Sequence, residues 1–247
     1  MRFTFLRLAP LWATLSASGP LHAAASLLVD DAGTTPEGTC QLETWTRQHA
    51  GHRELTAVPA CTLSGTELSL GLSHLRGERA MPWALGAKRA VRHWHDERLQ
   101  LAASIETAGD VRQGGARSWS LNLPLSVALD RQALATAHFN AGWSRSRHER
   151  GITLGAGVDI RIAPTWSLLA EQARDAARHR SSHLGIRRHL PGEASLDLLA
   201  GRLHVRTGTS WITVGLNLPL WRCGSPRRAS PPPFPLPPDK RNHHDEP

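Results

Sequence analysis

The sequence contains no tyrosine, only three cysteines among 247 residues, and no long uninterrupted apolar run. A membrane-spanning helix needs ~20 predominantly apolar residues, and after the first 25 residues no segment comes near that length, so a helical membrane protein is not expected. A nucleophile elbow, a P-loop, an H-E-x-x-H motif and a complete dinucleotide fingerprint are also missing. The sequence therefore predicts neither an enzyme nor a cofactor.

The first 25 residues have the composition of an export signal. Arg2 and Arg7 flank a short apolar core, and Ala23-Ala24-Ala25 offers a cleavage site before Ser26. A membrane anchor is the alternative, but proline, serine and glycine interrupt the apolar core. Removal of residues 1–25 leaves a basic chain, and an exported basic chain meets a membrane surface more readily than nucleic acid.

The three cysteines are Cys40, Cys61 and Cys223. In an oxidising compartment the first two are a plausible disulfide pair. A hairpin that turns at residues 49–52 places them directly opposite each other, within disulfide range. Cys223 remains as the odd thiol.

Apolar and polar residues alternate along most of the chain, as in "SWSLNLPLSVAL" over residues 118–129. A period of two is typical of β-strands, and the longer runs approach the 9–11 residues of a tilted membrane strand. Residues 166–178 also fit a helix, which leaves that segment the least certain. The pattern predicts an all-β, antiparallel up-and-down transmembrane barrel over residues 26–221, with about twelve strands near 40–48, 53–62, 66–75, 82–92, 97–107, 117–129, 134–145, 150–162, 166–174, 182–190, 194–205 and 210–221.

The connections between these segments alternate in length. Turns such as Ser64-Gly65 and Ala163-Pro164 are tight, whereas the loops at 108–116 and 175–182 are longer and basic. Short inner turns and longer outer loops are typical of outer-membrane barrels. Tryptophans near strand ends favour an interfacial belt, although the lack of tyrosine weakens this argument; they are Trp83, Trp94, Trp119, Trp143, Trp166, Trp211 and Trp221.

Two motifs resemble outer-membrane proteins. The segment from Thr213 to Trp221 resembles the terminal-strand recognition pattern of Gram-negative barrels. The start at residues 27–45 is similar to putative transporters of the meta-pathway phenol-degradation family, through Asp30, Asp31, Ala32, Gly33, Glu43 and Trp45. The resemblance implies a cell outer membrane location, and its partners would be lipids, lipopolysaccharide, the barrel-assembly machinery and small-molecule solutes. The proline-rich tail at 222–247 departs from it and is expected to be disordered or polyproline II.

Charged residues inside the predicted strands are the candidate selectivity residues of a lumen. In hydrocarbon a basic side chain costs about 2–4 kcal/mol at the midplane, so these residues should face the lumen or lie near the rims. They would form either a charged filter or a salt-bridged plug. The candidates are Glu43, Glu106, Asp159, Arg161, Glu171, Asp197 and Arg202.

Asp30 and Asp31 are candidates for anchoring the N-terminus. They could bind Ca²⁺, but the spaced acidic loop of a calcium site is missing. We expect one carboxylate to cap a turn beside Gly33, the other to face water or a lumen arginine, and the segment to lead into the first strand.

The other candidate sites are weaker. "HWHDE" at 93–97 could hold a metal, but a solvated turn is the simpler interpretation, and His243-His244 lacks further ligands. The leading functional hypothesis is a passive channel for small molecules. The alternatives are a closed structural or binding barrel and a lipid-modifying enzyme that uses Ser181 or Ser182 beside His183.

Overall fold

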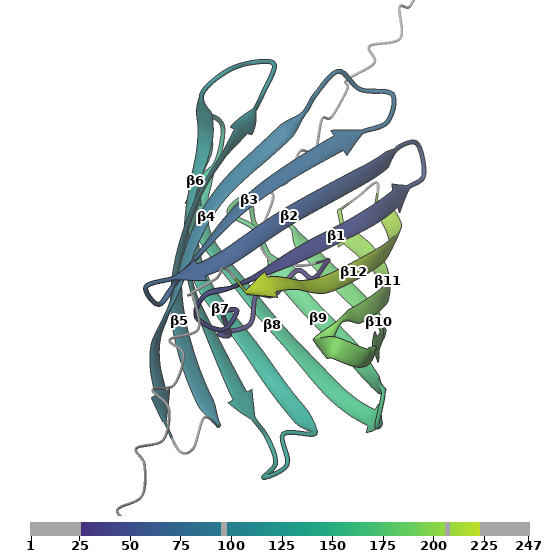
Figure 1. The fold of residues 1–247 in the computed structure, drawn as a ribbon. Helices are drawn as coiled ribbons and strands as arrows, with labels where there is room; N and C mark the ends of the chain where they lie inside the picture. The colour runs from purple at the N-terminus through teal and green to yellow at the C-terminus, as the bar shows by residue number, and fades with distance from the viewer. Residues whose placement is uncertain (1–25, 95–97, 206–207, 223–247) are drawn as a thin grey trace, which may run out of the picture.

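The protein is a closed barrel of twelve antiparallel strands in which each strand pairs with its neighbours in sequence and β1 pairs with β12 (Figure 1). The computed structural model describes residues 26–94, 98–205 and 208–222. A 3₁₀ turn, η1 (Pro191–Glu193), connects β10 to β11. The strands are β1 (Thr39–His49), β2 (Arg53–Leu63), β3 (Thr66–Leu75), β4 (Pro82–Trp94), β5 (Leu99–Asp110), β6 (Ala116–Ala128), β7 (Ala135–Arg145), β8 (Arg150–Ala163), β9 (Trp166–Arg174), β10 (Arg180–His189), β11 (Ser195–His204) and β12 (Ser210–Arg222).

The alternation of side chains explains why these segments close into a barrel with an apolar exterior. Leucine, isoleucine, valine and phenylalanine side chains on one face of β2 to β12 remain exposed, among them Leu70, Leu121, Phe139, Ile152 and Leu184. Most of the alternate positions are small or polar, and they point inward. The prediction of a twelve-stranded barrel is confirmed, and residues 166–174 form a strand rather than a helix. In the described part of the chain, no helix has the length and apolar character needed to cross a membrane.

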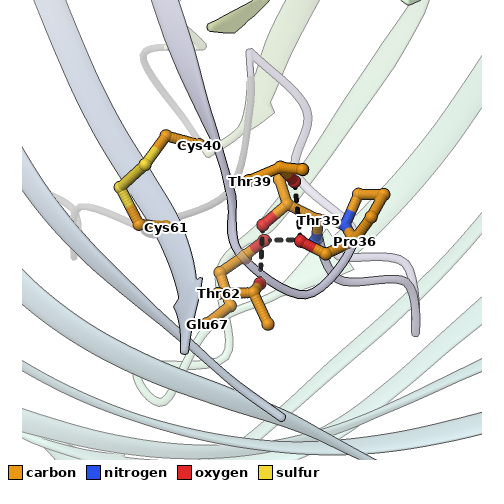
Figure 2. Close-up of a disulfide and its surroundings, with 7 residues drawn as sticks. All are labelled: Thr35, Pro36, Thr39, Cys40, Cys61, Thr62 and Glu67. Atoms are coloured by element: carbon orange, nitrogen blue, oxygen red, sulfur yellow. Dashed lines mark hydrogen bonds between the residues drawn. A yellow bond between two sulfur atoms is a disulfide. The ribbon is translucent and has the colours of Figure 1, made fainter. Parts of the chain in front are cut away.

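The first hairpin carries the predicted disulfide. Cys40 lies opposite Cys61 in the register of β1 and β2, their Cα atoms are 4.1 Å apart, and their sulfurs are bonded (Figure 2). The turn closes where His49 N–H donates to His52 O at 2.9 Å, as the hairpin register predicts. Because Val58 is buried toward the lumen, alternation places Cys61 on the outward face.

We expect the double variant Cys40→Ser/Cys61→Ser to be less stable by about 3 kcal/mol, because the bridge closes a loop over a sequence separation of 21 residues. Urea unfolding of the purified barrel in detergent measures this difference. Cys223→Ser is the matched control and should leave the free energy of unfolding unchanged. Equal unfolding midpoints for the two variants would show that the bridge is dispensable once the strands are paired.

The connections keep most of the predicted asymmetry. β2–β3 and β8–β9 are joined by two-residue turns, while β3–β4 and β5–β6 have longer loops. The β6–β7 turn is an exception, because it spans residues 129–134. Asp130 organises it: backbone N–H groups of Ala135 and Leu134 donate to the carboxylate and lower its pKa.

The tryptophans do not all form an outward belt. Trp119 and Trp143 are half-exposed on the outer surface, as an interfacial belt requires. Trp211 instead is buried in the lumen, where its indole N–H donates to His183 at 2.9 Å. Trp45 is also buried, on the inward face of β1. The belt interpretation was therefore wrong for Trp211, because an indole N–H can also satisfy a buried acceptor.

Candidate functional site

The chain before β1 runs through the interior of the barrel. We call residues Ser26–Gly33 the plug segment; it is the dark purple coil inside the strands in Figure 1. Its hydrogen-bond partners come successively from β11, β9, β7 and β6, so it runs along the inner wall of the barrel. Val29 and Ala32 are completely or almost completely buried there. The segment leads into β1, and before it does so it lies inside the barrel, which the sequence did not indicate.

Side chains of the barrel wall bind the backbone of the plug segment. The Glu171 carboxylate accepts the N–H groups of Leu28 at 2.9 Å and Val29 at 3.2 Å. Asn140 contacts Asp30 twice: its Oδ1 accepts the Asp30 N–H at 2.8 Å and its Nδ2 donates to the Asp30 carbonyl at 2.7 Å. These bonds satisfy backbone groups that would otherwise be buried without partners.

The rest of the segment is bound in the same way. Ser126 Oγ accepts the Ala32 N–H at 2.8 Å. Beyond the plug segment, the Glu67 carboxylate accepts the Thr35 N–H at 2.7 Å (Figure 2). An irregular segment can remain inside a barrel only when its peptide groups are paired in this way.

Lys88 of β4 ties the two plug carboxylates to the wall. Its Nζ lies 2.8 Å from Asp30 Oδ1 and 3.6 Å from Asp31 Oδ1. Lys88 and Asp30 are largely buried, whereas Asp31 is more than half exposed. Asp31 Oδ1 also accepts the Gly33 N–H at 2.6 Å, which is the turn cap expected from the sequence. Asp30 therefore pairs with a lumen lysine instead of an arginine.

Two glycines of β8 make room for the plug segment. A Cβ added at Gly155 would lie 3.1 Å from Val29 Cγ2, and one at Gly157 would lie 3.5 Å from Val29 Cβ. The first distance is tighter than ordinary van der Waals contact. Gly155 and Gly157 are therefore positions of the lumen wall against which the plug segment packs.

An ionic cluster lies beside the start of the plug segment. Arg187 donates through Nε to Asp197 Oδ1 at 2.7 Å and through Nη2 to Asp197 Oδ2 at 2.8 Å, a bidentate pair. Arg187 Nη1 also lies 3.8 Å from Asp159 Oδ2. Asp197 Oδ2 accepts the hydroxyl of Ser26 at 3.0 Å, so the cluster contacts the plug segment directly.

A second chain of buried polar groups supports Glu171. His183 Nε2 accepts the indole N–H of Trp211, so the proton of the neutral imidazole ring is on Nδ1. Nδ1 then donates to Glu171 Oε2 at 3.3 Å. Glu171 can then use its remaining acceptor capacity for the plug backbone. The chain of bonds connects β12 and β10 to the plug segment through β9.

Two cavities flank the plug segment. One has a volume of about 320 Å³ and is lined by both acidic and basic side chains, including Asp31, Asp159, Arg161 and Arg187. It also contacts Ala133 and Leu134 of the β6–β7 turn, so it lies toward the short-turn end of the barrel. The other, about 70 Å³, lies between Ser26, Asp197 and β12. The plug segment therefore narrows the lumen without filling it.

Six of the seven strand charges predicted to line the lumen are on inward-facing positions, and five of them contact the plug segment or a cavity beside it. Asp197 and Glu171 bind the segment, and Asp159 and Arg161 line the larger cavity. Glu43 lines the smaller cavity. Glu106 lies on the inward face of β5, because its neighbour Ile105 is exposed on the outward face. Arg202 differs, since it is exposed on the outward side of β11 near its end. Their effect on selectivity remains a prediction.

Sequence reasoning missed the residues that hold the plug segment. Lys88 and Arg187 occupy the inward face of their strands. The sequence could have indicated this, because each lies three residues after an apolar residue of the outward face, Leu85 and Leu184. Asn140 and Ser126 are ordinary polar residues in alternating strands, so only the fold reveals their contacts with residues 30 and 32.

The alternative chemical sites are not assembled as predicted. His183 bonds to Trp211 and Glu171, while Ser182 points to the opposite face and bonds to His204 at 2.9 Å, so Ser182 and His183 do not form the pair that the enzyme alternative needs. No group of three or more potential metal ligands occurs within residues 26–94, 98–205 and 208–222. Some of the predicted features lie outside the described residues, namely His95 to Glu97, Cys223, His243, His244 and the predicted signal peptide.

Comparison with solved structures defines the class as an outer-membrane β-barrel of porin-like fold. The barrel is similar to the KdgM porin (TM-score 0.61, 9% identity, 73% of this chain and 99% of that chain) and to the NanC porin (0.55, 9%, 73% and 100%). It is also similar to the COG4313 outer membrane channel from Pseudomonas putida F1 (0.50, 11%, 77% and 98%). Such low identities establish the fold alone.

The particular family follows from the sequence. Residues 11–220 match the family described as uncharacterised conserved protein UCP029691, and the chain belongs to that family. No curated protein matches the chain.

Proposed function

We propose that this protein is a narrow outer-membrane channel for small polar solutes, with the plug segment as its constriction. The observation that carries the proposal is the cavity of about 320 Å³ beside the plug, which is lined by both carboxylates and arginines. Such a lining favours polar or charged solutes over apolar ones. Solved porins of similar fold support a channel, and one KdgM structure is in complex with disordered oligogalacturonate.

The plug segment itself favours a second candidate, a closed structural or binding barrel. Its backbone is bonded to three strands, the hydroxyl of Ser26 to a fourth, and its two carboxylates pair with Lys88. If the space left beside the bound segment is too narrow for solutes and ions, the lumen transmits nothing and the protein serves as a scaffold in the membrane. Both candidates use the same fold, and they differ in whether ions pass.

Recording in planar bilayers separates the two. For the channel we expect small, reproducible conductance steps, and we expect liposomes containing the protein to admit amino acids and monosaccharides but to exclude longer oligosaccharides. Arg161→Gln, which removes a positive charge from the cavity wall, should shift the ion selectivity toward cations, while Arg188→Gln on the outward face should not. Silent bilayers with the wild-type protein would favour the closed barrel.

The membrane partners remain part of the proposal. The exposed apolar band suits a lipid environment, and the arginines of the longer loops would meet the phosphates of lipopolysaccharide. Barrel-assembly machinery would insert the strands into the membrane. The similarity of residues 30–33 to the meta-pathway phenol-degradation family suggests small organic solutes as a more specific hypothesis.

A further inference from the structure

The first described residue, Ser26, is buried inside the barrel. Only 4% of its surface is exposed, and its hydroxyl donates to Asp197 Oδ2 at 3.0 Å. On β12, Gly215 leaves the space that Ser26 occupies, because a Cβ at residue 215 would lie 2.7 Å from both Cβ and Oγ of Ser26. The barrel wall therefore provides both a hydrogen-bond acceptor and a space for the side chain of Ser26.

Beside Ser26 lies a buried hydrogen-bond acceptor that has no donor in the part of the chain that the structure describes. The cavity of about 70 Å³ beside it is lined by Asn217, Glu43 and Asp197. Asn217 Oδ1 is buried and has no hydrogen-bond donor among the described residues. A buried acceptor without a partner is costly, so its presence points to a donor that completes the site.

The charges around the plug segment point the same way. Among the described residues, the charged wall side chains bonded directly to the segment or to Thr35 are three carboxylates, Glu67, Glu171 and Asp197, and one cation, Lys88. The segment itself adds Asp30 and Asp31. Arg187 offsets part of this excess through Asp197 and Asp159. A further positive charge near Asp197 would improve the balance.

We propose that the chain is cleaved between Ala25 and Ser26 and that the new α-ammonium group of Ser26 becomes a resident cation of the lumen, bound between Asp197 and Asn217. Hydrolysis of this peptide bond consumes one water, leaves a carboxylate on Ala25 and gives Ser26 an ammonium with three protons to donate. The group forms where the Asp197 carboxylate, the Asn217 amide oxygen and the gap at Gly215 meet. Export processing would thus complete the plug as well as release the leader.

The test begins with the full chain expressed with its own leader and purified from outer membranes. Intact-mass measurement and N-terminal sequencing should identify Ser26 as the first residue. The α-amine is then acylated at neutral pH with an N-hydroxysuccinimide ester, in the folded barrel and in the urea-unfolded chain. We expect labelling of the folded protein to be at least about tenfold slower, because the amine is buried and bonded.

Asp197→Asn and Gly215→Ala should each raise the labelling rate of the folded protein, the first by weakening the charge pairing and the second by displacing Ser26. Glu149→Gln, which changes an exposed loop carboxylate, is the matched control and should not. A mature chain that starts elsewhere, or a folded amine labelled as fast as the unfolded one, overturns the proposal. The wild-type comparison is decisive even if a variant fails to assemble. Conductance does not enter the test, so its result is independent of the proposed channel.

Discussion

Deleting residues 27–34, with Ser26 retained to preserve the predicted cleavage site, should raise the single-channel conductance at least about threefold, because conductance grows with the free cross-section of the lumen. The deleted residues include every backbone group that Glu171, Asn140 and Ser126 bind, so the strands remain while the constriction disappears. Recordings in planar bilayers at fixed salt measure the change. The larger cavity would then be continuous with the space that the segment had occupied.

A graded variant distinguishes removal of the plug from general damage to the barrel. Lys88→Met breaks the contacts with Asp30 and Asp31 but retains the segment, so we expect noisy openings between the wild-type level and that of the deletion. Arg89→Met, on the next and outward-facing position of β4, is the matched control and should conduct like the wild type. If the deletion leaves the conductance unchanged, the limiting constriction lies elsewhere in the lumen.

The strands and the disulfide could be predicted because their signals are local. Alternation fixes which residues share a face, and the distances of Cys40 and Cys61 from the hairpin turn fix their pairing. The plug segment has no such period. Its position depends on partners far away in sequence, such as Asn140, which lies 110 residues from Asp30. Long-range contacts of an irregular segment emerge only once the barrel brings the strands together.

For the candidate site, the sequence indicated some of the residues but not their contacts. Glu171 and Asp197 were identified because a charge inside an alternating strand must avoid lipid. The same reasoning does not reveal that Asp197 contacts Ser26, or that Trp211 turns inward to bond with His183. Tryptophan near a strand end suits either the lipid interface or a buried acceptor, and the sequence alone does not distinguish these environments.

Replacing Arg187 by Met should destabilise the barrel by about 3 kcal/mol, since removing one partner of a buried ion pair leaves an uncompensated charge. Asp197 has a side-chain exposure of only 6% and loses both bonds of its bidentate pair, and Asp159 loses a nearby cation. Urea unfolding in detergent, or the temperature at which the folded form is lost on gels, measures the effect. Arg188→Met, on the outward face of the same strand, is the matched control and should change stability little.

The double variant Arg187→Met/Asp197→Asn should recover more than half of the lost stability. The neutral amide removes the excess negative charge that the loss of Arg187 leaves beside Asp159, and it can still accept the hydroxyl of Ser26. Recovery would identify charge pairing, and not the volume of the arginine, as the main contribution of Arg187. If the double variant is no more stable than Arg187→Met, packing around the guanidinium contributes more to stability than the ion pair does. In that case water in the adjoining cavity hydrates the ionised Asp197.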